Sequence, residues 1–122
     1  MKVELKHRTK KIGIDIIKLT EERSQNLSAG IICKQLIRCG TSIGANYRAA
    51  CRAKSTADYI NKLKIVEEEA DETLYWLDIA TELKMFNLEK LGKAMAEVNS
   101  IVAIIVSSIK TLRLKIKNVK GR

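Results

Sequence analysis

Four cations on one predicted helix are the residues of this sequence whose spacing points most clearly to a chemical role. They fall within about 80° of one another on a helical wheel, and they are Lys34, Arg38, Arg48 and Arg52. The opposite side of the same helix is apolar and holds Ile32, Leu36, Cys39, Ile43, Tyr47 and Ala50. A row of guanidinium and ammonium groups binds phosphates or carboxylates. This basic stripe therefore predicts a polyanion or an acidic partner rather than catalysis.

The basic stripe differs from an ordinary solvated helix face. Lysine and arginine commonly form the wet side of a bundle helix, but such faces mix charge signs. Residues 26–54 contain five Lys and Arg and no acid. We therefore expect weakly sequence-specific contacts with RNA or DNA phosphates, made by Lys34, Arg38, Arg48, Arg52 and Lys54. Four cations near the end of the chain would supplement them, namely Lys115, Lys117, Lys120 and Arg122.

Patterns for catalysis or metal binding are weak. The single histidine, His7, has no carboxylate or cysteine beside it in the sequence, so triad-type catalysis is not predicted. Cys33 and Cys39 lie at neither the knuckle nor the helical spacing of metal ligands. Glu68 and Glu72 share a helix face, but the histidine of a di-iron motif is missing. We expect no enzymatic activity, catalytic residue, metal or cofactor, and a carboxylate metalloenzyme is a third, minor hypothesis.

The pattern Gly40-x-x-x-Gly44 is not a phosphate-binding loop, because Ala45 and Asn46 replace the Lys-Ser/Thr pair that such a loop requires. It lies within a predicted helix and indicates close contact with a facing helix. Thr41, Ser42 and Asn46 are expected to form hydrogen bonds across that contact.

Composition predicts one all-α domain. The chain has 122 residues, no proline, 4% aromatic residues and a net charge of +9, which suits helices packed by aliphatic side chains. Three cysteines exclude a complete disulfide framework and favour a reducing, cytoplasmic location. The N-terminus lacks a signal-like apolar region, and the longest apolar run, residues 101–106, is too short to cross a bilayer. A membrane partner is not expected.

Hydrophobic periodicity and capping residues divide residues 1–122 into four helices, at about 6–23, 28–54, 56–85 and 88–118. Asn26 or Ser28 is expected to cap the second helix, Ser55 the third and Asn87 the fourth. Short connections favour an antiparallel up-down-up-down four-helix bundle.

The third predicted helix has a second half-apolar stripe, formed by Ile65, Glu69, Glu72, Trp76, Ile79 and Leu83. A helix that is apolar on two sides buries both, so this stripe predicts an interface between copies of the chain. Its carboxylates would need cationic partners. The alternative to nucleic-acid binding is therefore a structural or adaptor oligomer that binds a protein partner. In that oligomer the basic stripe meets Glu68, Glu69 and Glu72 of a neighbouring subunit.

The fourth predicted helix has an uninterrupted heptad seam of Leu88, Leu91, Met95, Val98, Val102, Ile105, Ile109, Leu112, Ile116 and Val119. This seam is longer than three neighbouring helices would cover. Residues 115–122 are therefore expected to project as a basic tail.

The middle of the chain, residues 35–83, resembles the four-helix-bundle family whose founding members are encoded by intervening sequences in bacterial 23S ribosomal RNA genes. The residues that carry the resemblance are Gly40–Arg48, Arg52–Ser55, Ala57–Ile65, Glu68–Glu72 and Trp76–Leu77. The resemblance implies a left-handed antiparallel bundle that assembles as a homopentamer around a central channel, with no known catalytic activity. A related protein, the accessory variability determinant of diversity-generating retroelements, binds a reverse transcriptase and nucleic acid through a basic surface. The resemblance thus implies RNA, DNA or a nucleic-acid enzyme as partners.

Overall fold

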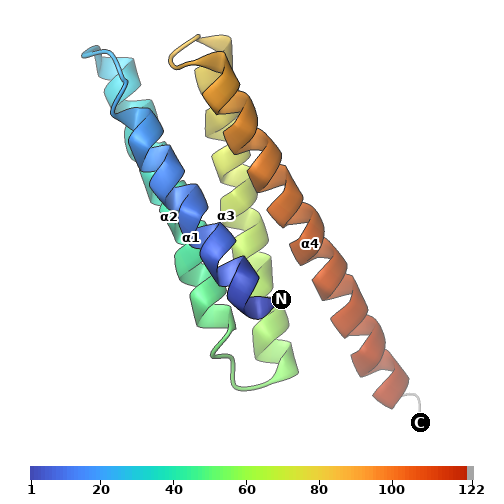
Figure 1. Ribbon diagram of the computed structural model, residues 1–122. Helices are drawn as coiled ribbons and strands as arrows, with labels where there is room; N and C mark the ends of the chain where they lie inside the picture. Colours follow the sequence, from blue (N-terminus) through green and yellow to red (C-terminus); the bar gives the residue numbers. More distant parts are fainter. Residues whose placement is uncertain (121–122) are drawn as a thin grey trace.

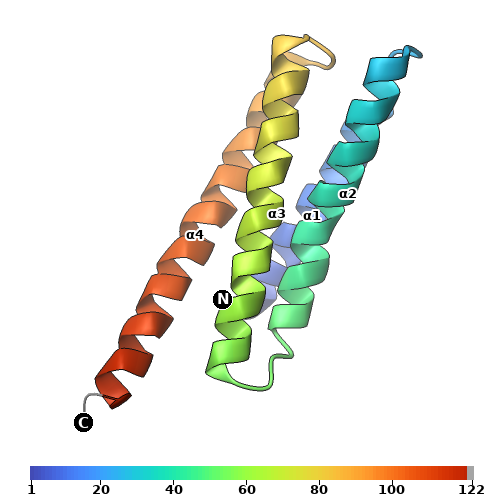
Figure 2. The same ribbon diagram turned by 180° about the vertical axis from the view of Figure 1, so that it is seen from behind.

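The computed structural model describes residues 1–120 and contains four α-helices, with no strand among those residues (Figure 1). The helices are α1 (Lys2–Thr20), α2 (Leu27–Ala50), α3 (Thr56–Glu82) and α4 (Leu88–Lys120). Consecutive helices run in opposite directions, and α4 returns beside α1 (Figures 1 and 2). The predicted all-α class is confirmed. Arg122, one of the expected phosphate contacts, lies outside the described residues.

Side-chain caps start three of the helices as the sequence predicts. Asn26, rather than Ser28, caps α2 and accepts a hydrogen bond of 2.8 Å from the Ala29 amide. The Asn87 side chain accepts one of 3.0 Å from the Lys90 amide at the start of α4. Ser55 accepts one of 3.0 Å from the Asp58 amide at the start of α3.

The end of α2 differs from the prediction. The helix stops at Ala50 rather than Lys54, because the Lys54 amide donates to the Asp58 carboxylate at 3.1 Å. Together with the Ser55 cap this bond resembles a capping box, except that the amide donor is Lys54, one residue before the cap, rather than Ser55 itself. It draws the chain out of the helix before Lys54. Arg52 and Lys54 therefore lie in the α2–α3 connection and do not continue the basic stripe along a helix.

The other helix ends shift for local reasons. The first helix begins at Lys2 rather than Lys6, because the Leu5 amide already bonds to the Met1 carbonyl at 2.9 Å. It ends at Thr20 rather than Arg23. The third helix ends at Glu82 rather than residue 85, because Lys84 adopts a left-handed conformation with φ 53°.

The core follows the predicted seam of α4 only in its middle. Leu91, Val98, Ile105 and Ile109 are buried, whereas Leu88 and Val119 are 59% and 71% exposed. The seam is longer than its neighbours cover, as the sequence predicts, because α4 has 33 residues against 27 in α3 and 19 in α1. Its last turns extend beyond the N-terminus of α1 (Figure 1).

By length and composition α4 also resembles a membrane span, since residues 88–119 include an 18-residue window of mean hydropathy 1.4. A core helix of a bundle meets the same description when it is mostly buried, whereas 22% of this window is buried here. In this bundle the buried residues of α4 face the neighbouring helices, and residues 98–109 contain no charged side chain.

Glycines bring α1 and α2 together. A Cβ on Gly13 would lie 3.2 Å from the Thr41 Cα, and one on Gly44 would lie 3.1 Å from the backbone of Lys10. The expected role of Gly40 and Gly44 in close helix packing is therefore confirmed. The expected hydrogen bonds across the contact are not, because Thr41 and Ser42 donate to carbonyls of their own helix. Asn46 likewise donates to a carbonyl of α2.

Replacement of Gly44 by alanine tests this close approach. The added methyl group meets backbone rather than a flexible side chain, so we expect a loss of about 1–2 kcal/mol in the free energy of unfolding. Gly92 in α4 is the matched control, since a Cβ there has no neighbour within 4 Å. Gly92→Ala should stabilise the protein by up to about 1 kcal/mol. Denaturant titration measures both, and stabilisation by both substitutions would contradict the close contact.

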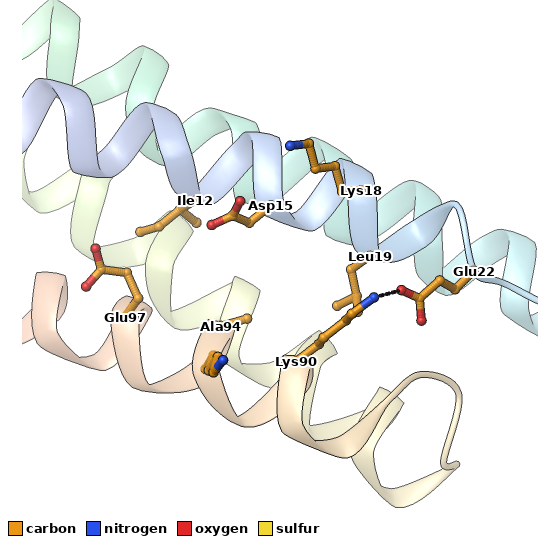
Figure 3. Close-up of a pocket in the computed structure, with 9 residues that line it drawn as sticks. Ile12, Asp15, Lys18, Leu19, Glu22, Lys90, Ala94 and Glu97 are labelled. Atoms are coloured by element: carbon orange, nitrogen blue, oxygen red, sulfur yellow. Dashed lines mark hydrogen bonds and ion pairs between the residues drawn. The ribbon is translucent and has the colours of Figure 1, made fainter.

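The fourth side of the bundle is the most open, because α1 and α4 make the least contact of any adjacent pair. A cavity of about 270 Å³ lies between them, with Ile12, Leu19 and Ala94 among its lining residues (Figure 3). Ion pairs bridge its two ends. Lys90 pairs with Glu22, and Arg8 donates to Glu97 through two hydrogen bonds of 2.6 and 3.0 Å.

The Arg8–Glu97 pair makes stability depend on pH. The hydrogen bonds from Arg8 lower the pKa of Glu97 below its ordinary value. The pKa of Glu97 is lower in the folded than in the unfolded protein, so ionised Glu97 stabilises the fold. This contribution is complete above the pKa of the unfolded state and is lost as the pH falls through the pKa of the folded state. Glu97→Gln should therefore lower stability by about 0.5 kcal/mol at neutral pH, a value discounted for solvent exposure, and by less in acid. Urea titrations at about pH 7 and about pH 3 measure the difference.

The control for this prediction is Glu89→Gln, which removes an exposed pair with Lys93 within α4. It should change stability little at either pH. Equal losses from the two variants, or a loss from Glu97→Gln that is the same at both pH values, would contradict the assignment.

Candidate functional site

Arg38 of the basic stripe pairs with carboxylates of α3. Its guanidinium donates to the Glu72 carboxylate and lies 3.7 Å from that of Glu69, both on α3 of the same chain. A further bond of 3.1 Å joins Arg38 to Gln35. The expectation that Arg38 contacts phosphate stays a prediction, and in this structure the Arg38 guanidinium already pairs with acids of α3. Glu69 and Glu72 were expected to find cations near a subunit interface, and they find Arg38 within the subunit.

A pair of variants on α2 tests this role of Arg38. Arg38→Gln leaves two carboxylates of α3 without their cation, and one Glu69 oxygen is buried. We expect a loss of about 1 kcal/mol in the free energy of unfolding. Lys34→Gln removes the same charge from an exposed position of the same helix and should have little effect. Thermal unfolding compares the two, and equal stability would show that the Arg38 pairs do not hold α2 to α3.

Arg48 turns to the other side of α2 and lies with residues of α1. The two helices border a groove of about 570 Å³. Its lining residues are Val3, Lys6, His7, Lys10, Gly13, Ile14 and Ile17 from α1 and Thr41, Gly44, Ala45 and Arg48 from α2. None of these described residues is acidic. We call this feature the α1/α2 groove.

The register of the glycine contacts explains which cations meet. Gly44 lies against Lys10, and the helices are antiparallel, so one turn along α2 brings Arg48 to the level of Lys6. Among the predicted phosphate contacts that the structure describes, Arg48 is the one that lines the groove with other cations. Lys34 is exposed on α2, and Arg52 and Lys54 are exposed in the connection, but these three do not line the groove.

Three residues of the groove escaped the sequence reasoning. Lys6 and Lys10 are spaced one helical turn apart in an ordinary mixed-charge helix, and His7 looked like a terminal surface residue. The sequence signal that could have identified them is Gly44, read as a position of close packing against the first helix. An antiparallel alignment that starts from this glycine places the first helix's cations beside Arg48.

The positive charge is concentrated in one half of the bundle. The half that holds the N-terminus comprises residues 2–11, 44–68 and 105–120 (Figure 1). It contains fifteen Lys and Arg and four Asp and Glu. The other half of the described chain contains seven Lys and Arg and ten Asp and Glu. Two of the expected contacts in the C-terminal turns of α4, Lys115 and Lys117, are exposed in the basic half. The main-chain position of Lys120 at the end of α4 is in the same half.

The outward side of α3 carries the opposite charge. Its exposed acids are Glu68, Asp71, Asp78 and Glu82. Beside them, the predicted interface stripe is only partly uncovered: Ile65 and Leu83 are 41% and 57% exposed, whereas Trp76 and Ile79 are half-buried against the core.

Metal ligands do not cluster in the described part of the chain. Among residues 1–120, no group of three His, Cys, Asp or Glu side chains could hold a metal ion. Cys33 and Cys39 are buried, and burial raises the pKa of both thiols.

In a comparison with known protein families, a family model described as 23S rRNA-intervening sequence protein matches residues 1–107 of this chain. This range includes the flanking helices as well as residues 35–83. A crystal structure of a protein of unknown function from the S23 ribosomal protein family of Bacteroides thetaiotaomicron is 33% identical in sequence. The similarity covers 87% of this chain and 98% of that one, with a TM-score of 0.80. No curated protein matches the chain significantly.

Proposed function

The chain belongs to the 23S rRNA-intervening sequence protein family, and we propose that it is a non-enzymatic protein that binds RNA or DNA phosphates through the α1/α2 groove. The observation that carries this proposal is the convergence of Lys6, Lys10 and Arg48 from two helices on a groove whose described lining has no acid.

The three cations suit phosphates rather than bases. Lys6 and Lys10 are about 6 Å apart along α1, and Arg48 faces them with a planar donor group that can bind a phosphate through two hydrogen bonds. Asn and Gln, which pair with adenine, do not line the groove. Arg and Lys can also contact guanine, but these three cations carry no further donor or acceptor pattern that would select a base. Binding with weak sequence preference follows from this composition.

The rest of the basic half extends the field of the groove. Lys2, Arg52 and Lys54 are exposed near its end, and further cations lie on the last turns of α4. Separated charges of one sign raise the encounter rate with a polyanion even where they make no direct contact. The assignment of Lys34, Arg52 and Lys54 as direct contacts stays a prediction.

Charge reversal at Arg48 tests the groove. Arg48→Glu should weaken binding of a labelled RNA oligonucleotide at least about tenfold and flatten its salt dependence, because one phosphate contact is lost and a repulsion replaces it. The matched control is Lys64→Glu, which makes the same net charge change on the exposed side of α3. Fluorescence anisotropy compares the variants, and equal weakening by both would show only a general effect of net charge.

The acidic side of α3 favours a second function, that of a structural or adaptor oligomer. We propose as this alternative that the α1/α2 groove receives the outward side of α3 from another copy. The acids would then be Glu68, Asp71, Asp78 and Glu82, since Arg38 of the same chain engages Glu69 and Glu72. The exposed Ile65 and Leu83 would become covered. Such a head-to-tail contact closes into a ring when its rotation allows, which fits the pentamer implied by the family resemblance.

The same Arg48→Glu variant separates the two functions. Light scattering should give an unchanged mass if the groove binds nucleic acid, with only the affinity for RNA reduced. A smaller particle would support the oligomer as the occupant of the groove and would contradict the nucleic-acid assignment.

A further inference from the structure

The α1/α2 groove has two chemically different parts. Its floor is formed where glycines let the two helices touch, so a ligand lies along the outside of the helix pair and does not enter between the helices. Toward the N-terminus of α1 the lining holds the cations, together with the exposed Val3. In the other direction it is uncharged and includes Gly13, Ile14 and Ile17.

The uncharged part contains exposed apolar side chains. Ile14 and Ile17 are 42% and 39% exposed. Phosphate groups do not bind to such side chains, because they are strongly hydrated. Burial of apolar surface is favourable only against a ligand surface that is itself apolar. The flat faces of unpaired bases are such a surface.

His7 lies in the cationic part of the groove, between Lys6 and Lys10 along α1. It is exposed, and it lines the same groove as Lys6 and Lys10. Histidine is one of the side chains on which unpaired bases stack. A strand whose phosphates lie at the cations of the groove would hold a base within reach of this imidazole.

We propose that the α1/α2 groove takes a single strand of nucleic acid in preference to a duplex, with phosphates at Lys6, Lys10 and Arg48 and a base stacked on His7. This inference rests on the proposed function and names its substrate class. A duplex presents phosphates to the same cations, but its bases are stacked inside and leave His7 and Ile14 without a partner. Stacking and apolar contact therefore add affinity only for the single strand.

The direct test compares a labelled single-stranded RNA oligonucleotide with the same strand annealed to its complement. Anisotropy at one fixed salt concentration should show at least about tenfold tighter binding of the single strand, the amount that one stacked base supplies. Equal or tighter binding of the duplex would overturn the single-strand inference and leave the proposed function standing. Absence of binding by both probes at low salt would overturn the proposed function as well.

Substitutions at His7 identify the stacking contact. His7→Ala should weaken single-strand binding about tenfold and leave duplex binding unchanged, whereas His7→Phe should retain single-strand affinity. His7→Lys is the control for charge. Recovery of single-strand affinity with Lys but not with Phe would contradict stacking. Lys10→Gln should weaken both probes, because both use its phosphate contact.

Discussion

The contact between α1 and α2 at Gly13, Gly40 and Gly44 is the constraint on which the rest of the structure depends. A Cβ on Gly44 would lie 3.1 Å from the backbone of Lys10, so the two helices approach as closely as their backbones permit. This approach sets the register of the pair, and the register decides which side chains meet on the outside. It brings two lysines of α1 to Arg48, and it gives the groove a floor of small residues instead of a core-sized opening.

The cations of α2 are divided by the helices on either side. Arg38 turns toward α3 and pairs with Glu69 and Glu72, while Arg48 turns toward α1 and meets cations there. One side of the stripe is thus used to hold the bundle together, and the other accumulates unbalanced charge. The same division runs along the bundle axis, since the half with the N-terminus carries almost four times as many cations as acids. Internal pairing engages Arg38, and Arg48 joins the cations of α1 at one groove.

Local patterns were sufficient to predict the fold, because helix periodicity, the capping side chains and the absence of proline all act over a few residues. The end of α2 was not predicted, since it depends on Asp58 reaching back to the Lys54 amide. The site was predicted only in part. A helical wheel shows which residues of one helix share a face, but the partner of Arg38 and the neighbours of Arg48 come from other helices. His7 illustrates the same limit, because its role as a groove residue depends on the register of α1 against α2.

The salt dependence of RNA binding by the unaltered protein tests the central claim most directly, namely that cations gathered by the α1–α2 contact bind a polyanion. With three phosphates neutralised on a single strand, the logarithm of the binding constant should fall against the logarithm of salt concentration with a slope of about −2. Additional contacts from the basic half would make the slope steeper. Affinity that does not change with salt, or no binding at low salt, would contradict the account and would mean that another copy of the chain or a protein partner covers these cations.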